Sequence, residues 1–231
     1  MKASQRLRWL LVVLIFIGIG VWLYVGPLAP EPQLQLNQHP RARQITPRSF
    51  TFWALYADDT ARIIEFVTEC RKPNTGTLLY GPSLNSKHAI VSFELLGGQL
   101  SQQPVWREET YGGKVYLRPH YVLDVDSEQY GYDIQVQHPP HLHVKGNYRL
   151  FSLGIDPSSY YAQEIIAVAL PVAARIKNIY DYQPYRHITL DDWDVYFYDT
   201  TNIKQHISIH IYYRPTGESL PLDWQKIEMQ R

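Results

Sequence analysis

The hydrophobic pattern of the chain begins with one long apolar stretch near the N-terminus. From Trp9 to Val25 there are seventeen residues without a charged side chain, and the extension to Ala29 makes twenty-one. A helix of this length, at about 1.5 Å per residue, spans roughly 30 Å, which matches the hydrocarbon core of a bilayer. Because the segment from Leu10 to Ile17 is apolar on every face, a buried core helix with a polar stripe is disfavoured. Residues 9–29 are therefore predicted to form a transmembrane anchor.

The residues that flank this stretch set its orientation. Lys2, Arg6 and Arg8 precede it, whereas Glu31 is the only charged side chain among residues 26–40. Basic residues favour the cytoplasmic side, so we expect a single-pass protein of the cell membrane with residues 1–8 in the cytoplasm and its C-terminal domain outside. A cleaved secretory signal is the alternative, but its small-x-small cleavage pattern is missing.

Residues 26–48, which overlap the end of the anchor, are rich in proline. Their prolines are Pro27, Pro30, Pro32, Pro40 and Pro47. Segments of this composition are extended and semi-stiff, so residues 30–48 are predicted to be a spacer that holds the following domain away from the bilayer.

Beyond the spacer, short runs of β-branched and aromatic residues alternate with Pro, Gly, Asn and Asp clusters, a pattern typical of all-β domains. The clearest run is residues 205–213, where Ile207, Ile209 and Ile211 alternate with polar residues. Further strands are predicted at residues 88–95, 115–125, 132–137, 141–153, 175–180 and 194–198. Helical crossovers are missing, so we expect residues 49–231 to form a mainly antiparallel β-sandwich of eight to ten strands.

Two segments fit more than one kind of element. Residues 50–56 and 62–68 flank an Asp-Asp-Thr break and are predicted to form a hairpin. A helix over residues 61–71 is the alternative, because Ile63, Phe66, Val67 and Cys70 have helical spacing. Residues 164–170 are apolar throughout and fit either a short helix or a buried strand.

Composition narrows the function classes. The formal net charge is zero, and after residue 8 there remain 19 basic against 22 acidic side chains. Nucleic-acid binding needs a basic face, so we expect none. Cys70 is the only cysteine. No intramolecular disulfide can form, and the core alone must stabilise the fold.

The segment His138-Pro-Pro-His141-Leu-His143 is the sharpest candidate site. His141 and His143, two apart, would point to the same side of a strand, and His138 could approach them through the Pro-Pro turn. Three imidazoles on one face could hold zinc or copper. The segment holds no carboxylate or cysteine, so an exposed loop is the alternative interpretation.

Other polar clusters favour ordinary structural roles. His206 and His210 lie four apart, which on a strand separates them by roughly 13 Å, too far to share an ion. Asp124, Asp126 and Glu128 alternate as calcium ligands do, but Gln129 stands where the EF-hand loop needs glycine. Acidic turn residues that bond their own backbone explain this cluster, and also the cluster of Asp191, Asp192 and Asp194.

Tyrosine is abundant, with eighteen residues. Tyr196 and Tyr198 alternate as core or cross-strand residues do. Tyrosines also occur at positions 160, 161, 180, 182, 185, 212 and 213. An exposed row of tyrosines would suit a protein partner or a carbohydrate.

Motifs of nucleophilic catalysis and nucleotide binding are missing. We therefore expect a non-enzymatic protein of the cell envelope that binds a protein partner or serves a membrane assembly. The first alternative is a metal-binding protein that uses His138, His141 and His143. The second alternative is a carbohydrate or cell-wall binding module.

Overall fold

The computed structural model of the chain describes residues 47–69, 74–111, 113–125, 128–157, 161–216 and 221–231. The predicted anchor at residues 9–29 lies outside these ranges, as does nearly all of the predicted spacer. No helix within the described ranges has the length and apolar character needed to cross a membrane.

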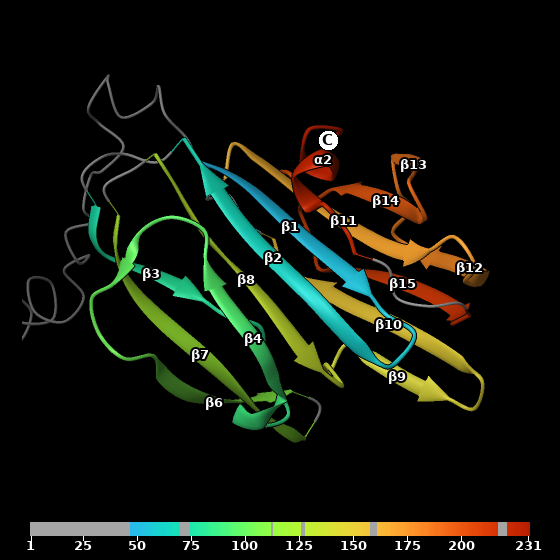
Figure 1. Cartoon of the computed structure of the whole chain (residues 1–231), viewed down its shortest axis with the longest axis horizontal. Coiled ribbons are helices and arrows are strands. Elements are labelled where there is room, and N and C mark those ends of the chain that lie inside the picture. The colour runs from blue at the N-terminus through green and yellow to red at the C-terminus, as the bar shows by residue number, and fades with distance from the viewer. Residues whose placement is uncertain (1–46, 70–73, 112, 126–127, 158–160, 217–220) are drawn as a thin grey trace, which may run out of the picture. The chain divides into compact units, whose positions relative to one another are not determined.

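The described chain is all-β, and its largest element is a seven-stranded sheet, here called the large sheet (Figure 1). In spatial order its strands are β13 (Arg186–Leu190), β14 (Trp193–Asp199), β11 (Gln163–Pro171), β1 (Arg48–Leu55), β2 (Thr60–Thr68), β8 (Gln129–Gln137) and β4 (Ile90–Leu95). All neighbours are antiparallel except β1 and β11, which pair in parallel. The parallel pair lies in the middle of the sheet.

The predicted hairpin is confirmed as β1 and β2. Asp58 starts the turn by accepting hydrogen bonds from the backbone N–H and the hydroxyl of Thr60, at 3.1 and 2.7 Å. The helical alternative is wrong, because residues 60–68 form the strand β2, which is buried on both faces. Ile63 and Val67 face one core while Ile64 faces the other, which gives apolar positions at helical spacing without a helix.

The ambiguous segment 164–170 is a strand, β11. Every residue from Ile165 to Pro171 is buried. A strand with neighbours on both sides and both faces covered has no position for a polar side chain, so the alternation that marks an exposed strand disappears.

Two four-stranded sheets complete the fold. The β7 sheet contains β3 (Asn74–Tyr80), β5 (Gln99–Leu100), β6 (Val105–Tyr111) and β7 (Lys114–Val125), and the β15 sheet contains β12 (Arg175–Asp181), β15 (Ile207–Arg214), β10 (Tyr148–Ile155) and β9 (Leu142–Lys145). Two short helical elements were not predicted, the 3-10 helix η2 (Lys87–Ala89) and the helix α2 (Trp224–Glu228).

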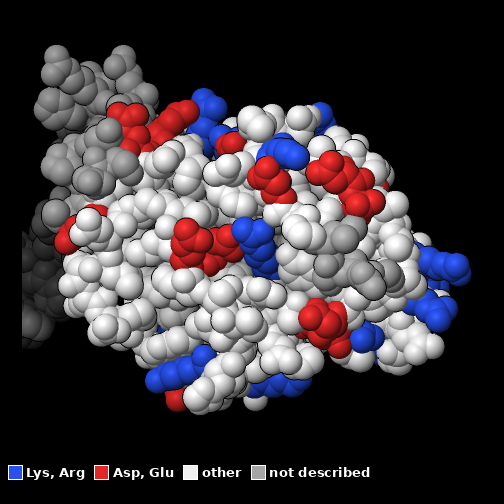
Figure 2. Space-filling model, in the orientation of Figure 1, with Lys and Arg blue, Asp and Glu red and all other residues white. Residues whose placement is uncertain are grey.

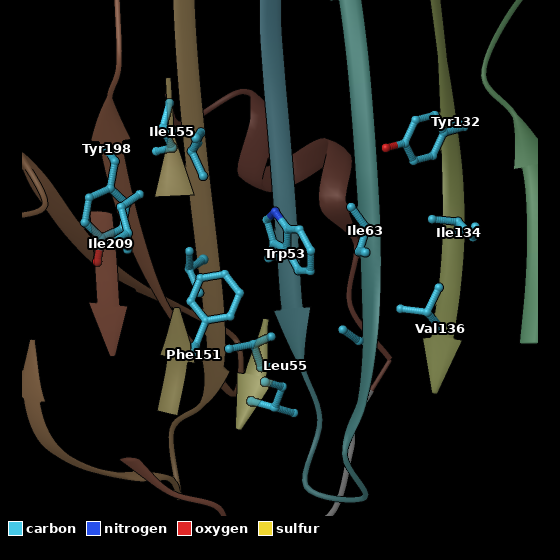
Figure 3. Close-up of a cluster of buried hydrophobic side chains, with 14 of the residues drawn as sticks. Trp53, Leu55, Ile63, Tyr132, Ile134, Val136, Phe151, Ile155, Tyr198 and Ile209 are labelled. Atoms are coloured by element: carbon cyan, nitrogen blue, oxygen red, sulfur yellow. The ribbon is translucent and has the colours of Figure 1, made fainter. Parts of the chain in front are cut away.

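One face of the large sheet packs on both smaller sheets. Trp53 of β1 contacts Phe151 of β10, with ring centroids 5.4 Å apart, and Ile209 of β15 lies in the same cluster (Figure 3). The opposite face of the large sheet forms a second core, where Phe50 and Trp193 share a cluster with residues of the C-terminal segment. The large sheet is therefore the middle of a layered β-domain.

The strand count differs from the expectation of eight to ten strands in two sheets. Fifteen strands in three sheets are described. The strands β3, β5, β6 and β13 were missed because polar residues interrupt their apolar runs, as Arg107, Glu108 and Glu109 do in β6.

Candidate functional site

The three histidines of the predicted metal site lie in different environments. His138 occupies the turn after β8 in the left-handed conformation, with φ of 49°. Its backbone N–H donates to the carbonyl of Asp59, and its carbonyl accepts from the amide of Asn85. The backbone of His138 thus anchors a turn, and its side chain is exposed.

His141 and His143 do not share one face. β9 begins at Leu142, so His141 belongs to the preceding turn, and its ring packs edge-on against Trp53 at 5.3 Å. Its Nδ1 lies 3.2 Å from the carbonyl oxygen of Ser152. Burial lowers the pKa of His141, which favours the neutral ring in this position. His143 lies on β9 and is exposed.

Among the residues that the structure describes, no three His, Cys, Asp or Glu side chains are arranged to hold a metal ion. The prediction that His138, His141 and His143 form a zinc or copper site assumed that His141 and His143 point to the same side of a strand and that His138 approaches them through the Pro-Pro turn. His141 lies in the turn before β9 instead, with its ring against Trp53, while the side chains of His138 and His143 are exposed.

The pair His206 and His210 is also divided between different partners. Nδ1 of His206 lies 2.9 Å from a carboxylate oxygen of Asp156, and Nδ1 of His210 lies 2.6 Å from one of Asp181. Each ring is therefore held by its own carboxylate.

The acidic clusters are turn and strand residues. Asp191 has a φ of 51° in the tight turn between β13 and β14. Asp194 accepts a hydrogen bond from the Thr189 hydroxyl, and its carboxylate lies 3.0 Å from Nε2 of His187. Asp124 lies on β7, and Asp126 and Cys70 are outside the described residues.

Several aromatic side chains lie together on the outer face of the β15 sheet. Alternation along β15 sends Ile209 and Ile211 into the core and His210 and Tyr212 outward. We call this outer surface the tyrosine face, and it comprises Tyr148, Leu150, Lys177, Tyr180, His210 and Tyr212.

Two stacked ring pairs form the tyrosine face. Tyr148 and Tyr212 have centroids 5.1 Å apart with an interplanar angle of 30°, and Tyr180 stacks on His210 at 4.8 Å and 26°. The four side chains are half-buried, so each ring is fixed by its neighbour and keeps part of its surface in contact with solvent.

Lys177 lies over both rings of the first pair. Its Nζ is 5.3 Å from the centroid of Tyr148 and 5.2 Å from that of Tyr212, within the range of cation–π attraction. The pairing of β12 with β15 shifts register between Ile176 and Asn178. Lys177 is the extra residue of this bulge, which directs its side chain over the rings.

A polar cleft of about 380 Å³ borders the far end of the same sheet. Its walls include Asp181, Tyr182 and Gln205, together with His206. Asp181, which lines the cleft, also bonds His210 of the tyrosine face.

Sequence reasoning found part of this surface. Tyr180 and Tyr212 belong to the tyrosines named as a candidate patch, and His143 lies on the strand next to Tyr148 and Leu150. Tyr212 and Tyr213 are neighbours but face opposite ways, and Tyr213 is 1% exposed. The core role of Tyr196 and Tyr198 is confirmed.

Lys177 and Tyr148 were missed. A bulge is not visible in the pattern of apolar residues, so nothing in the sequence indicated that Lys177 would cover two rings. Tyr148 follows the Gly-Asn turn between β9 and β10, which was predicted as one continuous strand over residues 141–153.

Known proteins add little to this picture. No protein-family model matches the chain, and no curated protein matches it. Among solved structures, the chain is similar to the NMR structure of the folded domain of the LppM protein from Mycobacterium tuberculosis, with a TM-score of 0.34 and 12% sequence identity over 76% of this chain and 95% of that chain. Similarity at this level carries no argument about function.

Proposed function

We propose that the chain is a non-enzymatic, single-pass protein of the cell envelope whose β-domain binds a partner outside the cytoplasm. The observation that carries the binding role is the tyrosine face, where stacked aromatic rings and a lysine lie on the open side of a sheet. Aromatic side chains with an apolar body and a polar tip are enriched at binding surfaces.

The proposed location rests on the sequence. The uncharged stretch from Trp9 to Val25 has the length of a membrane span, and Lys2, Arg6 and Arg8 precede it. Residues 49–231 would then lie beyond the bilayer, with the proline-rich spacer between them and the membrane.

The two alternatives differ in their support. A metal-binding role through His138, His141 and His143 is disfavoured by the separate environments of the three rings. A carbohydrate or cell-wall binding module requires a row of exposed aromatic side chains, and the partly exposed tyrosines on one sheet face support this alternative.

The binding role can be tested with the full chain in a neutral detergent, immobilised through its C-terminus. Envelope material from the native cell, sonicated in the same detergent, is passed over the wild-type chain and over the double variant Tyr212→Ala, Lys177→Gln. We expect the retained mass to fall at least fivefold in the double variant. The matched control is Lys226→Gln, because Lys226 is an exposed lysine on α2, outside the tyrosine face.

Equal retention by the wild-type chain and the double variant would refute the binding role of the tyrosine face. Circular dichroism of each variant, recorded beforehand, shows whether it retains the wild-type fold.

A further inference from the structure

We infer that the tyrosine face binds an anionic glycan, a sugar polymer that carries carboxylate or other negatively charged groups. This inference rests on the proposed function, since it names the partner of the same surface. Three properties of the face support it: the ring geometry, the local charge and the polar groups beside the rings.

The ring geometry suits a sugar. A pyranose ring has a flat patch of C–H groups on each side, and these groups carry partial positive charge that is attracted to the negative face of an aromatic ring. The Tyr148–Tyr212 and Tyr180–His210 pairs are spread along one sheet face, so a chain of sugar units could pack on both in succession. The stacking partners already fix the rings, which lowers the entropy lost on binding.

The charge of this region is opposite in sign to that of the domain. Five of the 22 basic side chains and one of the 22 acidic side chains precede residue 47, so the remainder of the chain holds 17 basic against 21 acidic groups. The end of the β15 sheet nevertheless presents exposed basic side chains from three of its strands: Lys145, Arg175, Lys177 and Arg214.

These four cations are available for a ligand. Within the described ranges, none of them forms an ion pair with a carboxylate. Arg175 and Arg214 are direct neighbours across β12 and β15, so two like charges face each other on one side of the sheet. Like charges opposite each other are unfavourable, and an anionic ligand between them would relieve the repulsion. Figure 2 shows basic side chains at the end of the molecule where β12 and β15 are labelled in Figure 1.

Polar groups lie beside the rings. Asn178 pairs with Tyr212 across the strands and is exposed, and Ser208 precedes His210 on the same side of β15. Both side chains can donate and accept hydrogen bonds, as sugar hydroxyls require. The cleft beside Asp181, at the end of the sheet opposite the cations, is lined by further polar side chains.

A lipid surface fits this face less well. A protein surface that enters the membrane interface needs protruding apolar side chains beside its basic ones. Leu150 is the single aliphatic member of the tyrosine face, and it is half-buried. The aromatic members are stacked on each other along the sheet, so they do not protrude as separate anchors.

The test measures equilibrium binding of the full chain, in neutral detergent, to four defined probes. Polygalacturonate is the anionic glycan, dextran the neutral glycan, poly-L-glutamate an anionic polymer without sugar, and phosphatidylglycerol vesicles the anionic lipid surface. We expect polygalacturonate to bind at least tenfold more tightly than the other three probes, because it alone offers both sugar faces and negative charge.

Variants separate the two contributions. Lys145→Gln with Lys177→Gln should weaken polygalacturonate binding roughly tenfold and flatten its salt dependence, since each exposed ion pair contributes modestly. Tyr212→Ala should remove the preference for polygalacturonate over poly-L-glutamate, while Tyr212→Phe, which keeps the ring, should retain it. Lys226→Gln should bind as the wild-type chain does.

Tighter binding to vesicles or to poly-L-glutamate than to polygalacturonate would overturn the glycan inference, and so would polygalacturonate binding that Tyr212→Ala leaves unchanged. If the wild-type chain retains native envelope material but not polygalacturonate, the glycan inference fails while the proposed function stands. If the tyrosine-face variants retain envelope material as the wild-type chain does, the proposed function itself fails.

Discussion

Arg62 on β2 and Asp133 on β8 form a bidentate ion pair across neighbouring strands of the large sheet. Nε of Arg62 donates to Oδ1 of Asp133 at 3.0 Å, and Nη2 donates to Oδ2 at 2.5 Å. The Nη1 group of the same guanidinium donates to the carbonyl oxygen of Leu222 at 2.9 Å. One side chain thus links the sheet to the C-terminal segment that covers its second core.

We expect Arg62→Leu to lower the free energy of unfolding by about 2 kcal/mol, because it leaves the partly buried Asp133 carboxylate without its partner. Urea denaturation measures this loss. The matched control is Arg48→Leu, whose ion pair with Glu69 is nearly half exposed and should contribute less than about 1 kcal/mol. An equal decrease in the free energy of unfolding in the two variants would show that the contacts of Arg62 with Asp133 and Leu222 do not stabilise the domain.

Glu65 gives the domain a pH-dependent stability. The hydroxyl of Tyr132 donates to its carboxylate at 3.2 Å, yet burial raises the pKa of Glu65 to about 7. The folded state therefore holds this proton more tightly than the unfolded chain, and stability falls as the pH rises from about 4.5 to 7. The full change corresponds to roughly 3 kcal/mol.

Glu65→Gln should remove most of this dependence and make the protein more stable than wild type at pH 8, since glutamine stays neutral and still accepts from Tyr132. Thermal unfolding between pH 4 and 8 measures it. A smaller slope should remain, because burial also raises the pKa of Glu164, to about 6. A variant that keeps the wild-type slope would show that Glu65 is not the titrating group.

Gly131 on β8 is required by close backbone packing against β2. A Cβ atom at this position would lie 2.1 Å from the carbonyl oxygen of Glu65 and 2.9 Å from Cα of Phe66. We therefore expect Gly131→Ala to cost about 3 kcal/mol or more, measured by chemical denaturation. Gly146→Asn is the comparison, because Gly146 has a φ of 62° with open space around it, and asparagine tolerates this conformation. A mild effect of Gly131→Ala would contradict the β2–β8 register.

His141 is expected to act in packing. His141→Ala removes the edge-on contact with Trp53 and should lower the free energy of unfolding by about 2 kcal/mol. His143→Ala, at an exposed position, should change it by less than about 0.5 kcal/mol. Chelator treatment of the wild-type chain should leave its melting temperature unchanged. Stoichiometric zinc or copper that disappears in His141→Ala would restore the metal-binding alternative.

Much of the fold was predictable from local pattern. Alternation identified β15, the Asp-Asp-Thr break placed the β1–β2 hairpin, and the all-β class followed from the spacing of the runs. The parallel pairing of β1 with β11 could not be predicted, because it joins segments that are far apart in the sequence and no local residue encodes it. Strands that are buried on both faces, such as β2 and β11, have apolar residues on each face. Their sequences therefore lack the alternation of a half-exposed strand and also fit a helix.

The candidate site was only partly predictable. Which tyrosines face outward follows from the strand register, so Tyr212 could be distinguished from Tyr213 once β15 was placed. The position of Lys177 depends on a bulge, and the separation of His141 from His143 depends on where β9 begins. Both are outcomes of tertiary pairing.

The most direct test asks whether the tyrosine face is exported and occupied in the cell. A membrane-impermeant maleimide is applied to intact cells that carry Leu150→Cys or Lys226→Cys, each combined with Cys70→Ser; Leu150 lies on the tyrosine face, opposite Tyr212, and carries no charge or ring that the ligand needs. We expect both positions to be labelled, with position 150 labelled several-fold more slowly in cells than in the purified chain and position 226 labelled at similar rates in both. No labelling of either position on intact cells would contradict the proposed location, and unslowed labelling of position 150 would contradict the proposed binding surface.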